Sequence, residues 1–449
     1  MDGRPGPGIA SDRGPTVPGM GRGIGPRRYN GRIHPRPRGP SSVSPSKTPR
    51  VSHYTYQLHA RAALLEGLLG GILVTTDVVA RKTLHAGDFQ IMILTMAPSA
   101  SMLLALVLAR RFESVAQRKV FFWAGLIGRL SLLGMCFIFD AWPFLSLLVV
   151  GAVVQTVVIP AQNAVYQANY EPAIRGRLFG RAQVFGGIAT AAAALGAGFW
   201  LDQDPNAYRW LYPIAGVAGF AATQVFGSIK LRRTAPLTDP DSARNRAPLW
   251  RLLFEDAPFR RFETAMFVYG LGFMCMMPVF ARLFVDELHM EYSEASLARG
   301  VVFSAVPVVA ITFAGRMHDR LGLERVAIRS YVVLAIFAVW MALVRTPVQV
   351  VAGFALFGLG MAGVNIAWSM GPLKYAPSGQ AARYMGVHVA LVGIRALIGH
   401  PLGAAVASHF GSSRPTFAMA ALFFSAATLL MMRAERLDPR KHPAAPAAA

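Results

Sequence analysis

Glu66 is the ionisable residue with the clearest capacity for chemistry, because it lies inside a long apolar stretch, about 58–80. It follows about eight residues of that stretch, which is roughly 12 Å along a helix at 1.5 Å per residue. A carboxylate in such a place is costly in hydrocarbon and is a functional candidate by default. It could carry a proton or hold a cationic group of a substrate. It could also pair permanently with an arginine such as Arg129 or Arg395.

His388 and Arg395 lie seven residues apart in another apolar stretch, about 384–407, and so share one helix face. Arginine cannot discard its charge, so Arg395 needs a carboxylate or an anionic substrate within reach. Histidine titrates near physiological pH, so His388 could join a proton relay or could be a hydrogen-bonded packing residue. We expect Arg129 to form a structural pair and Asp77 to be an interfacial acid at the end of its span.

Two further stretches carry polar or aromatic stripes at helical spacing. The stretch 142–168 holds a sector of amides and a hydroxyl, made of Gln155, Gln162, Asn163 and Tyr166. The stretch 347–372 holds an aromatic and methionine-rich face with one amide, made of Phe354, Phe357, Met361, Asn365 and Trp368. Side-chain amides in hydrocarbon need partners, either on a neighbouring helix or in a water-filled cavity, and we expect the cavity. For the phenylalanines and the methionine, ordinary packing is an equal alternative.

The elements that must position these residues are membrane-spanning helices. Hydrophobic residues make up 54% of the chain and charged residues 15%, against about 25% charged in soluble proteins. A series of apolar runs of roughly 20 residues, separated by short polar breaks, cannot fit inside one soluble core. The expected spans are about 58–80, 88–109, 120–140, 142–168, 181–201, 207–229, 262–285, 294–314, 326–345, 347–372, 384–407 and 415–432. We therefore expect an all-α polytopic membrane protein with twelve transmembrane helices.

Basic residues alternate between the loops in a way that indicates orientation. If the N-terminus is inside, the cytoplasmic loops hold most of the basic residues, among them Arg110, Arg111, Arg118, Lys119, Arg316, Arg320, Arg325 and Arg329. The opposite loops hold fewer, and a comparable number of acids accompanies them. The positive-inside rule then places both termini in the cytoplasm. Because the net charge of +22 is distributed in this way, it is a topology signal and does not indicate nucleic-acid binding.

The organisation along the chain follows from these spans. Residues 1–56 are rich in Gly, Pro, Arg and Ser and lack the apolar core of a signal peptide, so we expect a disordered basic cytoplasmic tail. Two six-helix halves, 57–229 and 261–433, are expected on either side of a cytoplasmic linker, 230–260. Residues 434–449 are expected to form a second cytoplasmic tail.

The two expected halves show an internal repeat. Charged residues match at an offset of 206 residues, which pairs Arg110 with Arg316, Glu113 with Asp319 and Lys119 with Arg325. Internal repeats of this kind are typical of secondary transporters.

One loop resembles the Gly-x-x-x-Asp-Arg-x-Gly-x-x-Arg/Lys signature of the major facilitator superfamily. It is carried by Gly315, Arg316, Asp319, Arg320, Gly322 and Arg325. The corresponding segment 109–119 departs from the signature, since alanine replaces the first glycine and Glu113-Ser114 replaces the Asp-Arg pair. The resemblance is to poorly characterised bacterial members. It implies two six-helix halves around a central cavity lined by the first, fourth, seventh and tenth spans, and an inner-gate role for the loop.

These observations predict a secondary active transporter of a small solute that works by alternating access in the bacterial cytoplasmic membrane. Proton coupling through Glu66 is the leading mechanism, and a uniporter that uses a Glu66–Arg395 lock is the alternative within this class. A transporter-like sensor or assembly scaffold is the alternative from another class. The chain lacks a Gly-x-x-x-x-Gly-Lys-Ser/Thr loop for ATP. We expect no enzyme activity, cofactor or metal, and we expect a monomer surrounded by lipid.

Overall fold

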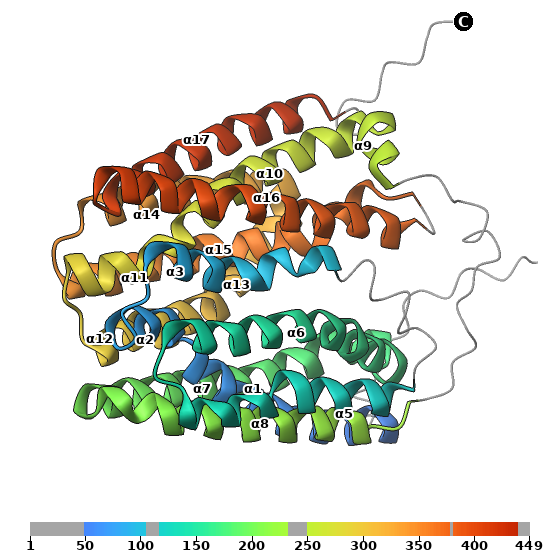
Figure 1. Cartoon of the computed structure of the whole chain (residues 1–449). Helices are drawn as coiled ribbons and strands as arrows, with labels where there is room; N and C mark the ends of the chain where they lie inside the picture. The colour runs from blue at the N-terminus through green and yellow to red at the C-terminus, as the bar shows by residue number, and fades with distance from the viewer. Residues whose placement is uncertain (1–48, 105–115, 232–248, 378–379, 439–449) are drawn as a thin grey trace, which may run out of the picture. The chain divides into compact units, whose positions relative to one another are not determined.

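The long apolar runs of the sequence form helices in the computed structural model (Figure 1), which describes residues 49–104, 116–231, 249–377 and 380–438. Every regular element in these residues is helical, and ten helices among them are long and apolar enough to cross a membrane. These ten are Arg50–Lys82, Gln117–Phe137, Ala141–Asn169, Ala173–Gln203, Ala257–Glu287, Tyr292–Leu321, Leu323–Leu343, Pro347–Tyr375, Ala381–Phe410 and Arg414–Arg436. The two other expected spans contain the shorter apolar helix Asp88–Leu104 and the helix Tyr208–Ser228. The all-helical membrane fold is therefore confirmed, and the described helices accommodate twelve spans.

The N-terminal helix group comprises the elements from α1 to α8. They are α1 (Arg50–Leu73), α2 (Thr76–Lys82), α3 (Asp88–Ala100), α5 (Gln117–Gly128), η1 (Leu130–Phe137), α6 (Ala141–Asn169), α7 (Pro172–Gln203), η2 (Pro205–Ala207) and α8 (Tyr208–Ser228). Within this group α1 packs on α7 and α8, and α5 packs on α6 and α8.

The C-terminal helix group comprises the elements from η4 to α17. They are η4 (Leu249–Arg251), α9 (Leu252–Glu255), α10 (Ala257–Met276), η5 (Met277–Val279), α11 (Phe280–Arg282), η6 (Leu283–Glu287), α12 (Tyr292–Ser296), η7 (Leu297–Val302), α13 (Phe303–Leu321), α14 (Leu323–Leu343), α15 (Pro347–Tyr375), α16 (Ala381–Phe410) and α17 (Arg414–Arg436). Here α14 packs on α15 and α17, and α10 packs on α16 and α17. The two groups meet where α7 contacts α12 and η7, and where α3 contacts α16 and η5.

Local sequence explains where several of these helices begin and end. Thr346 caps α15 by accepting a hydrogen bond from the Gln349 backbone N–H, and a proline follows it at the first helical position. Asp256 caps α10 in the same way. Gly322 joins α13 to α14 with φ of +86°, a conformation that disfavours residues with a Cβ. This requirement explains the second glycine of the loop signature.

The chain enters the first helix earlier than the sequence predicts. Helix α1 begins at Arg50, inside the stretch 1–56 that was expected to be a tail, and Pro49 precedes it. The Ser52 hydroxyl donates to the backbone carbonyl of Asn169 at 2.9 Å. The sequence-based boundary lies too late because these first turns are polar and are held by side-chain hydrogen bonds. The last part of the expected linker is likewise helical, as η4 and α9; residues 232–248 lie outside the described residues.

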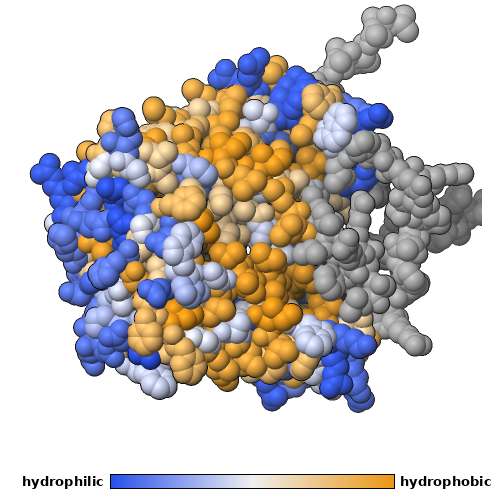
Figure 2. Space-filling model, viewed as in Figure 1, coloured by the Kyte–Doolittle hydropathy of each residue, from blue (hydrophilic) through white to orange (hydrophobic). Residues whose placement is uncertain are grey.

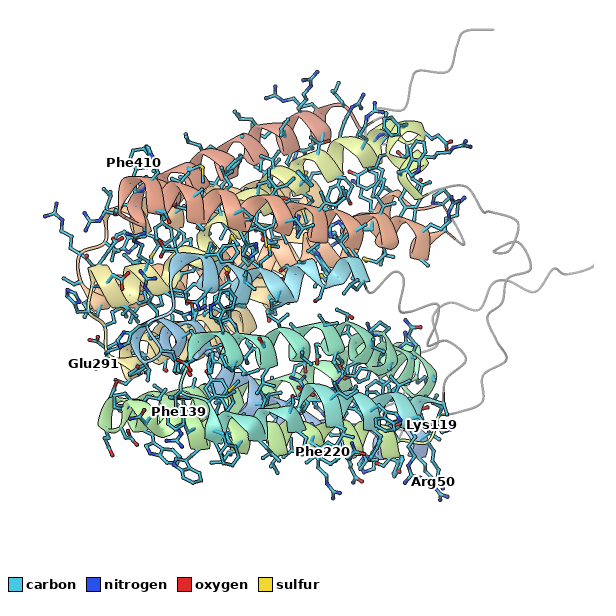
Figure 3. The ribbon with its side chains drawn as sticks, viewed as in Figure 1. Arg50, Lys119, Phe139, Phe220, Glu291 and Phe410 are labelled. Atoms are coloured by element: carbon cyan, nitrogen blue, oxygen red, sulfur yellow. The ribbon has the colours of Figure 1, made fainter. Side chains whose placement is uncertain are left out.

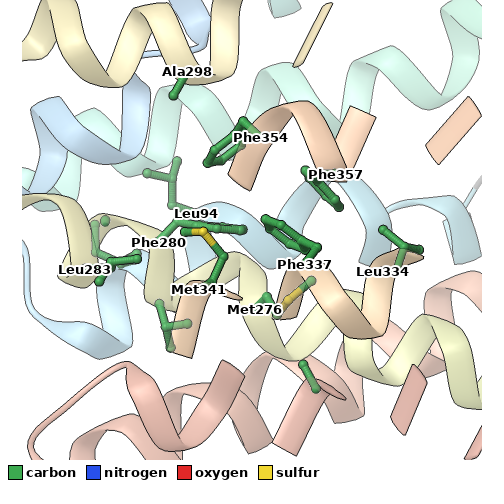
Figure 4. Packing of buried hydrophobic residues seen from close by; sticks show 14 of the residues in the cluster. Leu94, Met276, Phe280, Leu283, Ala298, Leu334, Phe337, Met341, Phe354 and Phe357 are labelled. Carbon is green, nitrogen blue, oxygen red and sulfur yellow. The ribbon is translucent and has the colours of Figure 1, made fainter. Parts of the chain in front are cut away.

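Apolar side chains cover the middle of the visible face, and hydrophilic side chains gather towards the end that carries α2, α11 and α12 (Figure 2). An apolar belt of this kind is what a bilayer requires of a spanning protein. Inside the C-terminal group, Phe280, Phe337, Phe354 and Phe357 form an aromatic core (Figure 4). The rings of Phe337 and Phe357 stack with centroids 4.6 Å apart.

Small residues let the helices approach one another closely, and one such contact gives a test of the packing. A Cβ added to Gly403 of α16 would lie 2.8 Å from the Cα of Cys275 in α10, whereas one added to Gly187 of α7 would meet nothing within 4 Å. We expect Gly403→Ala to destabilise the protein by about 1–3 kcal/mol, because two backbones must separate. Gly187→Ala is expected to leave stability unchanged or to raise it slightly. Thermal unfolding in detergent would compare them, and equal stability of both variants would contradict this packing.

Candidate functional site

A cavity of about 920 Å³ lies between the two helix groups, and both groups line it. From the N-terminal group its walls include Thr76, Asp77, Leu94, Thr95, Pro98, Met102, Arg129, Gln155, Thr156, Ile159, Pro160 and Asn163. From the C-terminal group they include Phe273, Met277, Phe280, Arg299, Phe303, Phe354, Phe357, Trp368, Met385 and Val389. Its volume is within the range of sites for small organic molecules, about 300–1,000 Å³.

The N-terminal wall carries a cluster of polar side chains centred on Arg129. Its Nη2 atom lies 3.4 Å from Oε2 of Glu66 and also donates to Oε1 of Gln155. Arg129 and Gln155 line the cavity, whereas Glu66 of α1 is not among the lining residues and lies behind them. Among the described residues, the other carboxylate oxygen of Glu66 is buried and has no hydrogen-bond partner.

The backbone explains how this cluster is held in place. Helix α5 ends at Gly128, and Arg129 joins it to the tighter helix η1, so its side chain extends from a change of helix type. Gly67, next to Glu66, packs so closely on α7 that a Cβ there would lie 2.7 Å from the Cβ of Ala189. The close packing of α1 on α7 fixes the position of Glu66.

The C-terminal wall is aromatic. The rings of Phe303 and Phe357 stack with centroids 4.8 Å apart, and Phe273 stacks on Phe357 at 5.9 Å. Trp368 completes this wall from α15. The aromatic lining residues therefore all belong to the C-terminal wall, whereas the polar ones other than Arg299 lie on the N-terminal wall among aliphatic residues.

A second charged pair, Asp77 with Arg299, joins the two helix groups at the cavity. An Nη1 atom of Arg299 lies 2.5 Å from Oδ1 of Asp77. Both residues lie at irregular backbone: Asp77 follows the break between α1 and α2, and Arg299 lies in η7, a π-helical segment of the kind often found at functional sites. The sequence-based expectation of a plain interfacial acid at Asp77 is therefore wrong, because this side chain is 4% exposed and lines the cavity.

Further ion pairs join the groups at the end that carries α2, α11 and α12, which we call the closed end. They are Arg81–Asp286 at 2.5 Å, Lys82–Glu291 at 3.1 Å and Arg282–Asp88 at 2.9 Å. Among the described residues, these pairs and Asp77–Arg299 are the ion pairs between the groups. Glu291 marks this end in Figure 3, opposite Arg50 and Lys119. The two groups are thus tied together at one end of the cavity.

The structure places the sequence-predicted residues in different surroundings. Gln155, Asn163 and Trp368 line the cavity. Gln162 is half-buried and Asn365 is exposed, and neither is among the lining residues.

Tyr166 lies beyond the cavity wall, with its hydroxyl 3.1 Å from Nε2 of the buried His59.

The two candidates on α16 are buried inside the C-terminal group. His388 is 1% exposed, and its Nδ1 lies 2.9 Å from the Glu263 carboxylate of α10. Its ring also contacts Trp368, with centroids 5.5 Å apart. Arg395 donates to the backbone carbonyl of Met266 at 2.8 Å. The considered pair of Glu66 with Arg395 is not formed, since Glu66 pairs with Arg129 instead.

Sequence reasoning did not single out Arg299 or Glu263. Arg299 lies in the expected span 294–314, but nothing in the sequence connects it to Asp77, which lies 222 positions earlier. Glu263 lies at the start of an expected span, where an acid normally reaches water. The available signal for this pair was that an acid, Glu263, and a histidine, His388, lie in two different expected spans.

The loop-signature residues lie away from the cavity. Gly315, Arg316, Asp319 and Arg320 belong to the last turns of α13, and the three charged residues among them are exposed. Arg325 pairs with Glu435 of α17 at 2.7 Å. Most of the corresponding segment 109–119 lies outside the described residues.

These features define a class: a helical membrane protein with a solute-sized cavity between two helix groups that are joined at one end. The model of the Major Facilitator Superfamily matches residues 62–276 and 262–449. The chain therefore belongs to the major facilitator superfamily of transporters.

Individual relatives are distant. The uncharacterized MFS-type transporter YuxJ of Bacillus subtilis is 23% identical over 275 residues, which are 61% of this chain and 69% of that protein. The multidrug resistance protein MdtG of Dickeya zeae is 30% identical over 193 residues, which are 38% of this chain and less than half, 43%, of that protein. A crystal structure of a mutant nucleoside transporter, NupG, has a TM-score of 0.68 at 13% identity and covers 85% of this chain and 99% of its own. At that identity it shows the fold alone.

Proposed function

We propose that this chain is a proton-coupled secondary transporter of a small solute that works as a monomer by alternating access. Its halves would be the N-terminal and the C-terminal helix groups, joined by a linker after α8. The observation that supports this best is the cavity, because both helix groups line it. The ion pairs that join the two groups gather at one end of this cavity. The proposal includes both termini in the cytoplasm of a bacterial cell; the closed end would then face outward, and this arrangement would be an inward-facing state.

The ion pairs at the closed end are weak enough to break and form again as the protein changes between two states. The side chains of Arg81 and Asp286 are 17% and 36% exposed, and those of Lys82 and Glu291 are 30% and 61% exposed. Ion pairs with such access to water each contribute about 0–1 kcal/mol. A solute that binds the two states with a difference of a few kcal/mol can therefore shift their populations. The more buried Asp77–Arg299 pair links the cavity to this end.

Glu66 supports proton coupling. Its carboxylate oxygen Oε1, which is buried without a hydrogen-bond partner among the described residues, is the atom to which a proton would add. Protonation would also release Arg129 from its ion pair. Because Arg129 and Gln155 line the cavity, the charge of Glu66 would change the surface that a solute meets.

Proton flux in liposomes tests this proposal. Purified protein would be reconstituted with a pH-sensitive dye inside, and candidate solutes would be added outside without any imposed gradient. A transported solute should move protons across the membrane at a rate that scales with its own uptake. Solute uptake without proton movement would contradict the coupling, and the absence of uptake across a broad solute panel would contradict the transport function.

A further inference from the structure

The charged residues in the cavity walls comprise one acid and two arginines. Among the described residues that line the cavity, the charged ones are Asp77, Arg129 and Arg299. Oδ1 of Asp77 and Nη1 of Arg299 lie 2.5 Å apart, so these two opposite charges offset each other, and among the described residues Oδ2 of Asp77 has no hydrogen-bond partner. Arg129 differs, because its carboxylate partner lies behind the wall at the longer distance of 3.4 Å. The charge that the cavity offers to a solute is therefore the guanidinium of Arg129.

The surroundings of Arg129 also suit an acceptor group on the solute. Gln155 lines the cavity and accepts from Nη2 of Arg129 through Oε1, so this contact does not use its amide N–H groups. A planar guanidinium can hold a carboxylate, sulfonate or phosphate through two parallel hydrogen bonds. A cationic solute would meet this guanidinium first, and its approach would be repelled.

The opposite wall suits an apolar body. Phe273, Phe303, Phe357 and Trp368 present rings to the cavity, and Met277 and Met385 add adaptable apolar side chains. A rigid aromatic body placed there would remove apolar surface from water on both sides.

We propose that the cavity binds an amphipathic organic anion, with its charged group on Arg129 and Gln155 and its aromatic or lipophilic body against the phenylalanine wall. This inference rests on the proposed transport function and names the substrate class of the same site.

The arrangement also couples this anion to a proton. The anion and the Glu66 carboxylate compete for one guanidinium, so protonation of Glu66 and binding of the anion favour each other. The ionisable groups that face Glu66 are Arg129 across the cluster and Tyr166 on α6, which in turn contacts His59. From α7 the chain presents small residues beside Glu66, at Gly186 and Ala189. The sign follows: the anion binds more tightly as the pH falls and Glu66 takes up its proton.

Three probes with one aromatic body and different charge test this inference. Naphthoate is an anion, naphthamide is neutral and naphthylmethylamine is a cation. Their binding would be measured by calorimetry on full-length protein in lipid nanodiscs at about pH 6 and about pH 8, where the charges of the probes themselves do not change. The variants would be Glu66→Gln, which leaves Arg129 without its carboxylate, and the double variant Glu66→Gln/Arg129→Gln, which removes both charges and leaves no orphan ion.

We expect the wild type to prefer naphthoate, and its affinity for naphthoate to fall about tenfold between the lower and the higher pH. Glu66→Gln should bind naphthoate tightly at both pH values. The double variant should lose the preference for the anion while it still unfolds cooperatively on heating. Equal binding of the three probes, binding of none, or an anion preference that survives in the double variant would overturn the inference. Because this is equilibrium binding, such a result leaves the transport function to be judged by flux and by inter-helix distances.

Discussion

Oxidation of a protein carrying Gly198→Cys and Ser296→Cys is expected to stop solute transport, and reduction is expected to restore it. A Cβ at Gly198 of α7 would lie 3.0 Å from the Cβ of Ser296 in α12, so a small shift brings the pair to the usual disulfide spacing of about 3.5–4.5 Å. The bond would lock the closed end, which must open if the cavity is to face outward. Uptake into proteoliposomes should fall to the level of empty liposomes. The native cysteines, Cys136 and Cys275, would first be replaced by alanine.

A matched disulfide inside one helix group serves as the control. Gly363 of α15 and Ser330 of α14 both belong to the C-terminal group, and a Cβ at Gly363 would lie 3.5 Å from that of Ser330. Two cysteines there should cross-link without effect on transport, because these helices move together. If the disulfide between α7 and α12 forms quantitatively and transport continues, the closed end does not open during transport.

Glu66→Gln is expected to abolish the response of transport to a pH gradient. The amide has the shape of the carboxylic acid but cannot exchange a proton, so Arg129 stays available whatever the pH. Binding should persist, whereas accumulation driven by an inward proton gradient should fall at least tenfold, to the level reached by equilibration across the membrane. The measurement is uptake of a transported solute into proteoliposomes with and without the gradient.

An exposed acid provides the comparison for this variant. Glu171, at the start of α7, is exposed, and Glu171→Gln should leave gradient-driven uptake intact. Gradient-driven uptake of normal size in Glu66→Gln would remove Glu66 from the proton path. The structural alternative, in which Glu66 only holds Arg129, would then remain.

The sequence predicts the helices well because each one is a long apolar run bounded by polar residues. The expected stretch 142–168 forms α6 (Ala141–Asn169), and 347–372 forms α15 (Pro347–Tyr375). Errors occur where polar residues continue a helix, as at the start of α1, where side-chain hydrogen bonds replace apolar burial. The rule that ionisable groups in hydrocarbon are candidates singled out Glu66, His388 and Arg395.

The sequence could not show which charges meet. Glu66 had two arginines as possible partners, and the choice between Arg129 and Arg395 depends on the packing of α1, α7 and α8. Asp77 and Arg299 lie 222 positions apart, and both are near helix ends where charges are common. Their burial follows from the break before α2 and the π-helical turn at η7. The periodic pattern of apolar residues along the sequence does not predict either of these helix irregularities.

The central claim is that the two helix groups rock about the cavity, and distances between spin labels test it most directly. One pair, Asn206 and Val348, lies in exposed positions at the closed end, and the other, Arg177 and Ala382, lies in exposed positions at the opposite end. Asp77→Asn would weaken the contact between Asp77 and Arg299 without adding bulk. We predict two distance populations in each pair: in this variant the distance at the closed end should shift to longer values as the distance at the opposite end shifts to shorter ones. A single population at both ends, unchanged by Asp77→Asn, would contradict alternating access and favour a static scaffold.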